Sequence, residues 1–228
     1  MSAVGAFARP VILFAHGAGA PSSSPWMQRW AERLGTVGDV ETFDYPYMAA
    51  GRRSPDRMPK LLAAHRAALD GALGRFGGER PVFLAGKSMG SRIGCHLSVD
   101  RAREGRPPAG IICFGYPLRA GRNGVLRDMV LRQLTVPIAF LQGSRDPLCP
   151  LEDLDKVRKS LTVPTELCIV EGGDHSLELR RRSFAEGERT QAQWDQTVLE
   201  TVRGFVARVL GQDDSQRMEA APGSGSAG

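Results

Sequence analysis

Short apolar runs alternate with longer amphipathic segments along most of this 228-residue chain. Runs such as Val-Phe-Leu-Ala and Ile-Ala-Phe-Leu show no polar alternation, which is typical of strands buried on both faces of a sheet. Their alternation with helical segments indicates βαβ units and predicts a parallel sheet. The strands are expected at residues 11–15, 40–44, 82–85, 110–114, 136–141 and 166–170.

The segments between these strands carry helix start signals and apolar stripes. Ser24 and Pro25 are expected to be the N-cap and first residue of one helix. Gly90 and Gly94 would let the helix that follows residue 88 approach the sheet closely. Further helices are expected at residues 58–73, 151–161 and 194–209, with a short one at 125–133.

The connections are too short for a lid domain between residues 116 and 136. Right-handed crossovers then predict a six-stranded parallel sheet in the order 2-1-3-4-5-6, with helices on both faces. In this order the first and third strands are neighbours at the topological switch point. The sequence therefore predicts a three-layer α/β fold.

Composition favours one globular domain, since 42% of the residues are hydrophobic and no repeat is present. We expect this domain to span residues 1–211 and the polar, glycine-rich residues 212–228 to form a disordered tail. The apolar runs are too short to cross a bilayer, and no signal segment is recognisable. A cytoplasmic protein without a membrane partner is therefore expected.

Charge and cysteine content exclude several function classes. The formal charge of +5 comes from basic residues spread over every element, so we interpret them as solvated surface and expect no nucleic-acid partner. The cysteines lack Cys-x-x-Cys spacing and are expected to be reduced thiols without a metal. They are Cys95, Cys113, Cys149 and Cys168.

One predicted strand runs directly into Gly-Lys-Ser-Met-Gly, at residues 86–90, and then into a helix. This is the pattern of a nucleophile elbow, which holds a serine hydroxyl on a tight strand-to-helix turn. Gly86 and Gly90 are explained by a strained turn that leaves no room for neighbouring β-carbons. The pattern predicts that Ser88 is a nucleophile at a helix N-terminus.

A serine hydroxyl needs a base, and the base needs an orienting carboxylate. Asp146 follows the fifth strand and His175 follows the sixth, so both occupy the order and sheet edge that a Ser-Asp-His triad requires. The rival acids are Asp174, which adjoins the histidine and would point elsewhere, and Asp153 and Asp155 on the next helix.

The loop after the first strand, His16-Gly-Ala-Gly-Ala, is rich in small residues. A backbone N–H from this loop, for which we choose Ala18, and the N–H of Met89 are expected to form an oxyanion hole. His16 is interpreted as a loop brace and His65 as a packed core histidine.

Gly86-Lys-Ser also ends a Walker A pattern, which would indicate a nucleotide-binding enzyme. The position five residues earlier is Pro81, however, and the residues between are the strand itself. No glycine-rich phosphate loop exists, and the loop after the first strand lacks the third glycine of a dinucleotide fingerprint. No cofactor is expected.

The motifs His-Gly-Ala-Gly-Ala, Gly-Lys-Ser-Met-Gly-Ser-Arg, Gly-Ser-Arg-Asp and Gly-Asp-His-Ser occur in this order. With them, residues 10–210 resemble the α/β-hydrolase superfamily. The chain is most similar to the dienelactone-hydrolase-related branch, which holds small bacterial hydrolases, a testis-expressed relative and the hydrolase-like domain of the third subunit of the non-specific-lethal chromatin complex. The resemblance implies a reduced sheet without an initial antiparallel pair of strands. Dienelactone hydrolases proper use a cysteine nucleophile where this chain has Ser88.

The triad residues predict a serine hydrolase that acts on a small ester or thioester through an acyl-enzyme. The alternative is a hydrolase-like interaction module with weak or no activity, because some members of the resembled branch serve as interaction domains. Tyr45 and Tyr47 are expected either to line the substrate pocket or to cover the sheet edge. Arg119, with Arg122 and Arg127, lies near the predicted mouth and indicates either an anionic substrate or ordinary solvated surface.

Overall fold

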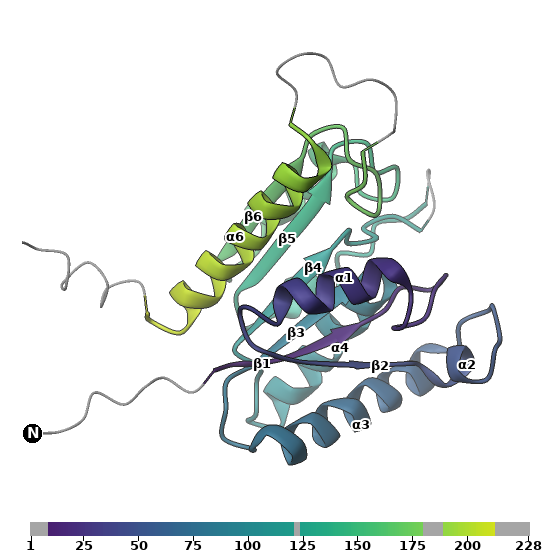
Figure 1. The fold of residues 1–228 in the computed structure, drawn as a ribbon, viewed down its shortest axis with the longest axis vertical. Helices are drawn as coiled ribbons and strands as arrows, with labels where there is room; N and C mark the ends of the chain where they lie inside the picture. Colours follow the sequence, from purple (N-terminus) through teal and green to yellow (C-terminus); the bar gives the residue numbers. More distant parts are fainter. Residues whose placement is uncertain (1–8, 121–123, 180–188, 213–228) are drawn as a thin grey trace, which may run out of the picture.

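The computed structural model describes residues 9–120, 124–179 and 189–212. One parallel sheet of six strands runs through it in the order β2-β1-β3-β4-β5-β6, so the predicted order is confirmed (Figure 1). The strands lie within two residues of their predicted bounds. They are β1 (Val11–Ala15), β2 (Asp39–Phe43), β3 (Val82–Lys87), β4 (Gly110–Phe114), β5 (Ile138–Gly143) and β6 (Thr165–Val170).

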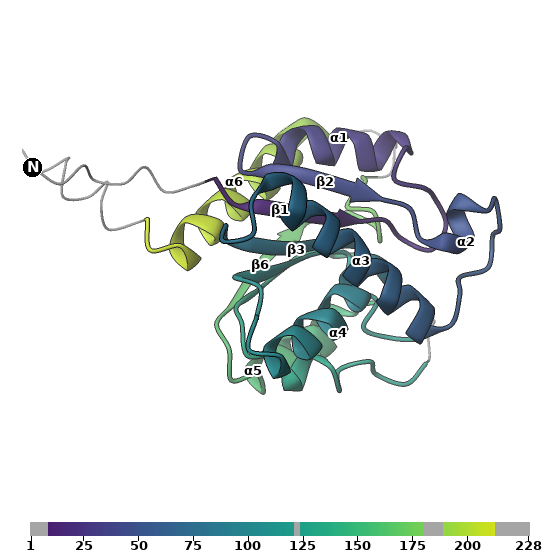
Figure 2. The same cartoon turned by 90° about the horizontal axis from the view of Figure 1, so that it is seen from below.

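Helices cover both faces of this sheet (Figure 2). On one face lie α1 (Pro25–Leu34) and α6 (Gln191–Val209), and on the other lie α3 (Met58–Phe76), α4 (Met89–Arg103) and α5 (Leu151–Lys159). Side chains of a strand alternate between the two layers. In β1, Phe14 packs with α1 and α6, whereas Leu13 packs with α3 and α4.

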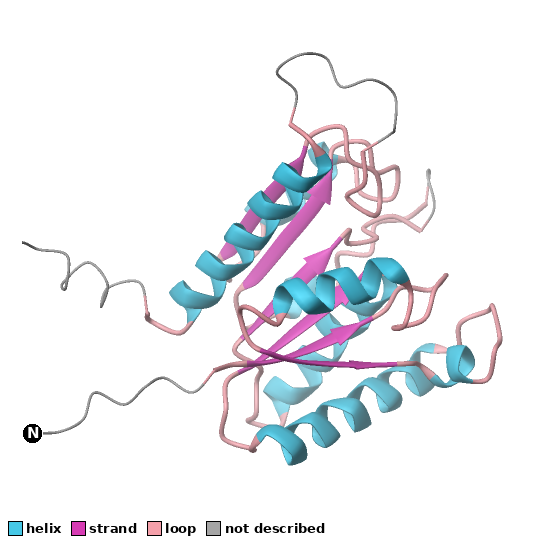
Figure 3. Cartoon of the chain, viewed as in Figure 1, coloured by secondary structure: helices cyan, strands magenta, loops and turns pink. Residues whose placement is uncertain are grey.

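The central strands form the most deeply buried part of the sheet. Every residue of β1, β4 and β5 is buried, and each large apolar side chain removed from water contributes about 1.5–3 kcal/mol. Because all strands are parallel, their C-terminal ends meet at one edge of the sheet, where the connecting loops gather (Figure 3). This edge is the expected place for a ligand site in an open α/β sheet.

The connection between β4 and β5 differs from the prediction. Instead of a helix over 125–133, it forms an antiparallel bridge between Arg119 and Leu126 and a single 3-10 turn, η1 (Leu131–Gln133). The apolar residues that suggested a helix differ in exposure. Val125 and Met129 are 83% and 70% exposed, whereas Val130 is buried. They therefore form no continuous helical stripe.

Two smaller features were not anticipated correctly. The one-turn helix α2 (Pro46–Ala49) follows β2. Gly94 is not required for close packing, because a Cβ there would lie 3.6 Å from its nearest neighbours, an ordinary contact distance.

The four cysteines are buried and free.

Within the described ranges, no helix has the length and apolar character that a membrane crossing needs. The same residues contain no group of three or more histidine, cysteine or acidic side chains suited to bind a metal ion. The predicted tail lies almost entirely outside the described residues, as does Arg122.

Candidate active site

Ser88 occupies the turn between β3 and α4 with φ 50° and ψ −112°, a left-handed conformation that a non-glycine residue rarely adopts. Its N–H donates to the carbonyl of Phe114 at the end of β4, at 2.9 Å. The flanking glycines make this turn possible. A Cβ on Gly86 would overlap the backbone of Ser91, and one on Gly90 would overlap the carbonyl of Ala15. The steric reason given for both glycines is confirmed.

A continuous chain of hydrogen bonds joins three elements at this edge. His175 Nε2 lies 2.7 Å from Ser88 Oγ, and His175 Nδ1 lies 2.6 Å from Asp146 Oδ2. A carboxylate can only accept, so Nδ1 carries the proton and Nε2 is left to accept the serine hydroxyl proton. The structure thus brings together the three residues that the motifs predicted, in one hydrogen-bonded chain from Asp146 through His175 to Ser88.

Asp146 is held from two further directions. Its Oδ1 accepts the N–H of Leu148 at 2.8 Å, and its Oδ2 accepts the side-chain amide of Gln142. Both Asp146 and Gln142 are buried. These bonds fix the face that the Asp146 carboxylate presents to His175. Gln142 was not identified from the sequence, although a polar residue inside the apolar run of β5 was a usable signal.

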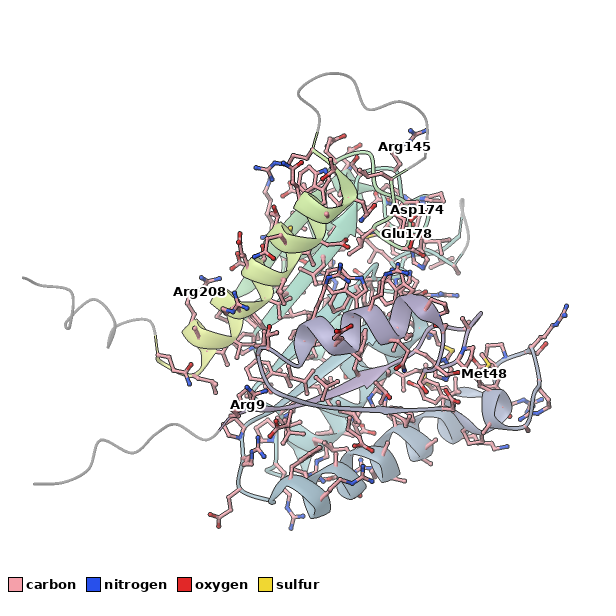
Figure 4. The ribbon with its side chains drawn as sticks, viewed as in Figure 1. Arg9, Met48, Arg145, Asp174, Glu178 and Arg208 are labelled. Carbon is pink, nitrogen blue, oxygen red and sulfur yellow. The ribbon has the colours of Figure 1, made fainter. Side chains whose placement is uncertain are left out.

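The rival carboxylates are occupied elsewhere. Asp174 Oδ1 accepts the N–H groups of Ser176 and Glu178, which closes the turn after β6. Figure 4 shows Asp174 and Glu178 side by side, far from Arg9 and Arg208 at the opposite edge of the sheet. Asp153 binds Arg119 and Asp155 binds Lys159. Within the described ranges, none of the three side chains makes a hydrogen bond or ion pair with the His175 ring.

Lys87 is the last residue of β3 and directly precedes Ser88. Its Nζ donates to the carbonyl of His175 and lies 5.4 Å from the centre of the Trp26 ring. Burial lowers the pKa of Lys87 to about 8. The side chain therefore connects the serine turn to the histidine loop, a function that the sequence analysis did not assign.

The loop after β1 places Ala18 beside the serine turn. A Cβ built on Gly17 would be 3.5 Å from Ser88 Cβ, and Ala18, Ser88 and Met89 line a common pocket. Met89 is the first residue of α4, where N–H groups lack intrahelical acceptors. Within the described ranges, neither the Ala18 N–H nor the Met89 N–H has a hydrogen-bond acceptor. Both are available to a developing oxyanion.

Tyr45 and Tyr47 do not line either pocket beside Ser88; both are fully buried behind the Ala18 loop. Tyr47 Oη donates to the Ala18 carbonyl at 3.0 Å. His16 Nδ1 pairs with the Gly17 carbonyl at 2.6 Å, and its Nε2 accepts the N–H of Tyr45 at 3.1 Å. The interpretation of His16 as a loop brace is confirmed, and burial lowers its pKa. The tyrosines thus support the loop and do not form a pocket wall.

His65 completes this support. It is fully buried, its Nδ1 lies 3.0 Å from Tyr45 Oη, and burial lowers its pKa to about 3. It is a neutral core histidine, as the sequence suggested.

Two pockets of similar size border Ser88. The Trp26 pocket, about 430 Å³, is lined by Trp26, Met27, Lys87 and His175 among others. The arginine pocket, about 410 Å³, is lined by Asp56, Met58, Met89, Arg92 and Arg127 among others. Both include Ala18, Ser88 and Leu148. A substrate with its reacting carbonyl at Ser88 would have a pocket on either side.

Arg119, expected near the mouth, lines neither of these pockets. Its Nε donates to Asp153 Oδ2 at 2.6 Å. The guanidinium is therefore held in an ion pair, and its position gives no support for substrate contact. Arg127, of the same predicted group, does line a pocket, together with Arg92, which the sequence analysis did not single out.

Comparison with known proteins places this geometry in context. A family model described as an alpha/beta hydrolase domain matches residues 8–207. Similar solved structures include an alpha-beta serine hydrolase homologue from Coxiella burnetii, with 17% identity, a TM-score of 0.64, and 90% of this chain and 86% of that one covered. At these levels of identity, structural likeness shows the fold alone.

Two further structures have named activities. A dienelactone hydrolase from Anabaena variabilis has 17% identity and a TM-score of 0.61, and the match covers 87% of this chain and 86% of that one. A thioesterase from the prodiginine biosynthetic pathway of Streptomyces coelicolor has 21% identity and a TM-score of 0.55, with 74% of this chain and 83% of that one covered.

Proposed function

The chain belongs to the α/β-hydrolase family, and on that premise we propose that it is a serine hydrolase acting on an ester or thioester of a small acyl group. The observation that carries this proposal is the hydrogen-bond chain from Asp146 through His175 to Ser88. Two unpaired N–H groups beside the serine, from Ala18 and Met89, support the same chemistry.

In the proposed first step, Ser88 Oγ attacks the substrate carbonyl carbon while His175 Nε2 takes the hydroxyl proton. The carbonyl π electrons move to its oxygen, which accepts hydrogen bonds from Ala18 and Met89. Asp146 stays ionised and stabilises the imidazolium. Collapse of the tetrahedral intermediate breaks the bond to the alkoxide or thiolate, which leaves with the proton from His175.

In the second step, His175 takes a proton from water as the water oxygen attacks the acyl carbon. The carboxylic acid then leaves, and Ser88 Oγ recovers its proton. Each step uses only the triad, the two N–H groups and water. The strained turn at Ser88 keeps the nucleophile oriented before substrate arrives, which reduces the entropy lost on reaching the transition state.

Turnover of a short-chain p-nitrophenyl ester tests this proposal. Ser88→Ala should lower kcat by about 1,000-fold or more. Ser160→Ala, which removes a hydroxyl at the end of α5, should match the wild type and serves as the control. Absence of wild-type turnover across ester and thioester panels, or equal turnover by Ser88→Ala, would refute the proposed serine hydrolase activity. Either result would favour the interaction-module alternative.

A further inference from the structure

The arginine pocket holds two cationic side chains close to the proposed reaction centre. Arg92 lies in the first turn of α4, four residues after Ser88, and Arg127 lies in the connection between β4 and β5. Both side chains are half-buried. They come from segments on opposite sides of β4 in the sequence and meet in one pocket with Ser88 and Met89.

Neither guanidinium has an anionic partner among the residues that the structure describes. Within the described ranges, no hydrogen bond or ion pair is made by the side chain of Arg92 or Arg127. Arg119 offers a contrast on the same connection, because it is paired with Asp153. Arg127 is held in place through its backbone, since its N–H donates to the Leu118 carbonyl and its carbonyl accepts from Tyr116 Oη. These two hydrogen bonds therefore hold the segment that carries Arg127, while its guanidinium makes no ion pair with any described residue.

The two arginines are also close enough to repel each other. Burial lowers the pKa of Arg92, and the charge of Arg127 lowers it further. Two half-buried like charges without a counter-ion destabilise the folded state. An anion between them would remove this cost, and guanidinium groups match carboxylate and phosphate oxygens well.

Two acidic side chains near the pocket are bound to other cations. Asp56 lines the pocket; its Oδ1 is bound by Arg52 and Lys60, and its buried Oδ2 has no hydrogen-bond partner among the described residues. Asp128, next to Arg127 in sequence, binds Arg132.

We propose that the arginine pocket is a subsite for an anionic group, a carboxylate or a phosphate, carried by the substrate of the proposed hydrolase. This inference rests on the proposed function for its link to catalysis. The anion would lie on one side of the reacting bond, and the rest of the substrate would occupy the Trp26 pocket.

Matched substrate pairs test the subsite. Mono-p-nitrophenyl adipate against p-nitrophenyl hexanoate places the carboxylate on the acyl side, and 4-acetoxybenzoate against phenyl acetate places it on the leaving side. We expect kcat/KM to be about 10-fold or more higher for the anionic member of one pair, the effect of one charge-assisted hydrogen bond. Rates are corrected with Ser88→Ala for spontaneous hydrolysis.

Variants assign the preference to the pocket. Arg92→Gln and Arg127→Gln should each reduce the anionic-to-neutral ratio of kcat/KM about 10-fold, whereas Arg119→Gln should leave the ratio unchanged. The two variants lie in different elements, so misfolding of one does not prevent the test with the other.

Isothermal titration with adipate and with n-butyl phosphate provides a readout that needs no turnover, and it distinguishes a carboxylate from a phosphate. Binding of either anion by the wild type that weakens in Arg92→Gln or Arg127→Gln would support the subsite even if no ester is hydrolysed, in which case only the proposed function fails. Equal kcat/KM within both pairs, together with no binding of either anion, would overturn the subsite and leave the hydrolase proposal intact.

Discussion

The two pockets beside Ser88 have nearly equal volumes and share three residues, yet they hold their cations differently. In the Trp26 pocket, Lys87 donates to the His175 carbonyl and lies over the Trp26 ring. In the arginine pocket, the side chains of Arg92 and Arg127 make no hydrogen bond or ion pair within the described ranges. Lys87 and Arg92 both lie within four residues of Ser88 in the sequence. We therefore interpret these two cations from their different surroundings. A paired buried cation supports the fold, whereas unpaired ones are available to a ligand.

Asp146→Asn should produce the largest effect and should affect substrates of both pockets alike. An amide that donates to His175 Nδ1 favours the tautomer in which Nε2 carries the proton and cannot accept one from Ser88. We expect kcat to fall by about 10,000-fold for p-nitrophenyl hexanoate and for the adipate ester. Asp153→Asn, which alters a rival carboxylate, should reduce neither rate by more than about two-fold. A loss confined to one substrate would contradict a common triad.

Lys87→Met should lower kcat about 10-fold for both substrates, because the His175 loop loses a charge-assisted hydrogen bond. The anionic-to-neutral ratio of kcat/KM should not change. Steady-state kinetics with both esters measures the two quantities separately. If the ratio fell as it is expected to fall in Arg127→Gln, Lys87 would belong to the anion subsite and the contrast between the pockets would be lost.

Two tyrosines provide a matched pair of smaller changes. Tyr47→Phe removes the hydrogen bond to the Ala18 carbonyl. We expect kcat to fall about three- to ten-fold for both esters, because the loop that carries Ala18 is held less firmly. Tyr116→Phe removes the bond to the Arg127 carbonyl and should instead reduce the preference for the anionic ester by a few-fold. If Tyr47→Phe changed the preference for the anionic ester and Tyr116→Phe lowered kcat for both esters, the roles given to the two loops would be wrong.

The smallest effect concerns stability. His65 has a folded pKa of about 3 and an ordinary pKa of 6.5, so the unfolded chain binds more protons between these values. The free energy of unfolding should therefore decrease as pH falls from about 6.5 towards 3, by at most about 1.4 kcal/mol per pH unit from this residue. Urea denaturation of the wild type and His65→Gln at pH 7, 6 and 5 tests this. The variant should show a shallower dependence, and parallel curves would contradict the assignment.

The strand order and the placement of Ser88, Asp146 and His175 at one sheet edge were predictable because their signals are local. Apolar runs, a glycine-flanked serine and acid and histidine residues after successive strands are visible in short windows of sequence, and parallel topology brings the strand ends together. The partner of Lys87 was not predictable in this way. Lys87 contacts a carbonyl 88 residues away, and nothing in its own segment indicates that contact.

Tyr45, Tyr47 and Arg119 line neither pocket beside Ser88, and the physical reason is the same for all three. Position after a strand placed Tyr45, Tyr47 and Arg119 near the site, but side-chain direction and available partners decided their roles. Tyr47 turns towards the Ala18 carbonyl, and Arg119 finds Asp153. Arg92 could have been noticed one helical turn after Ser88, although only the structure shows that it lacks a partner and meets Arg127.

Labelling with a fluorophosphonate followed by peptide mapping tests whether Ser88 is an activated nucleophile, because this probe forms a covalent bond with an activated serine. We expect a single modified residue, Ser88, in the wild type and at least about 100-fold slower labelling in His175→Ala. No labelling of the wild type, modification of a different residue, or equal labelling rates in the two proteins would contradict this expectation.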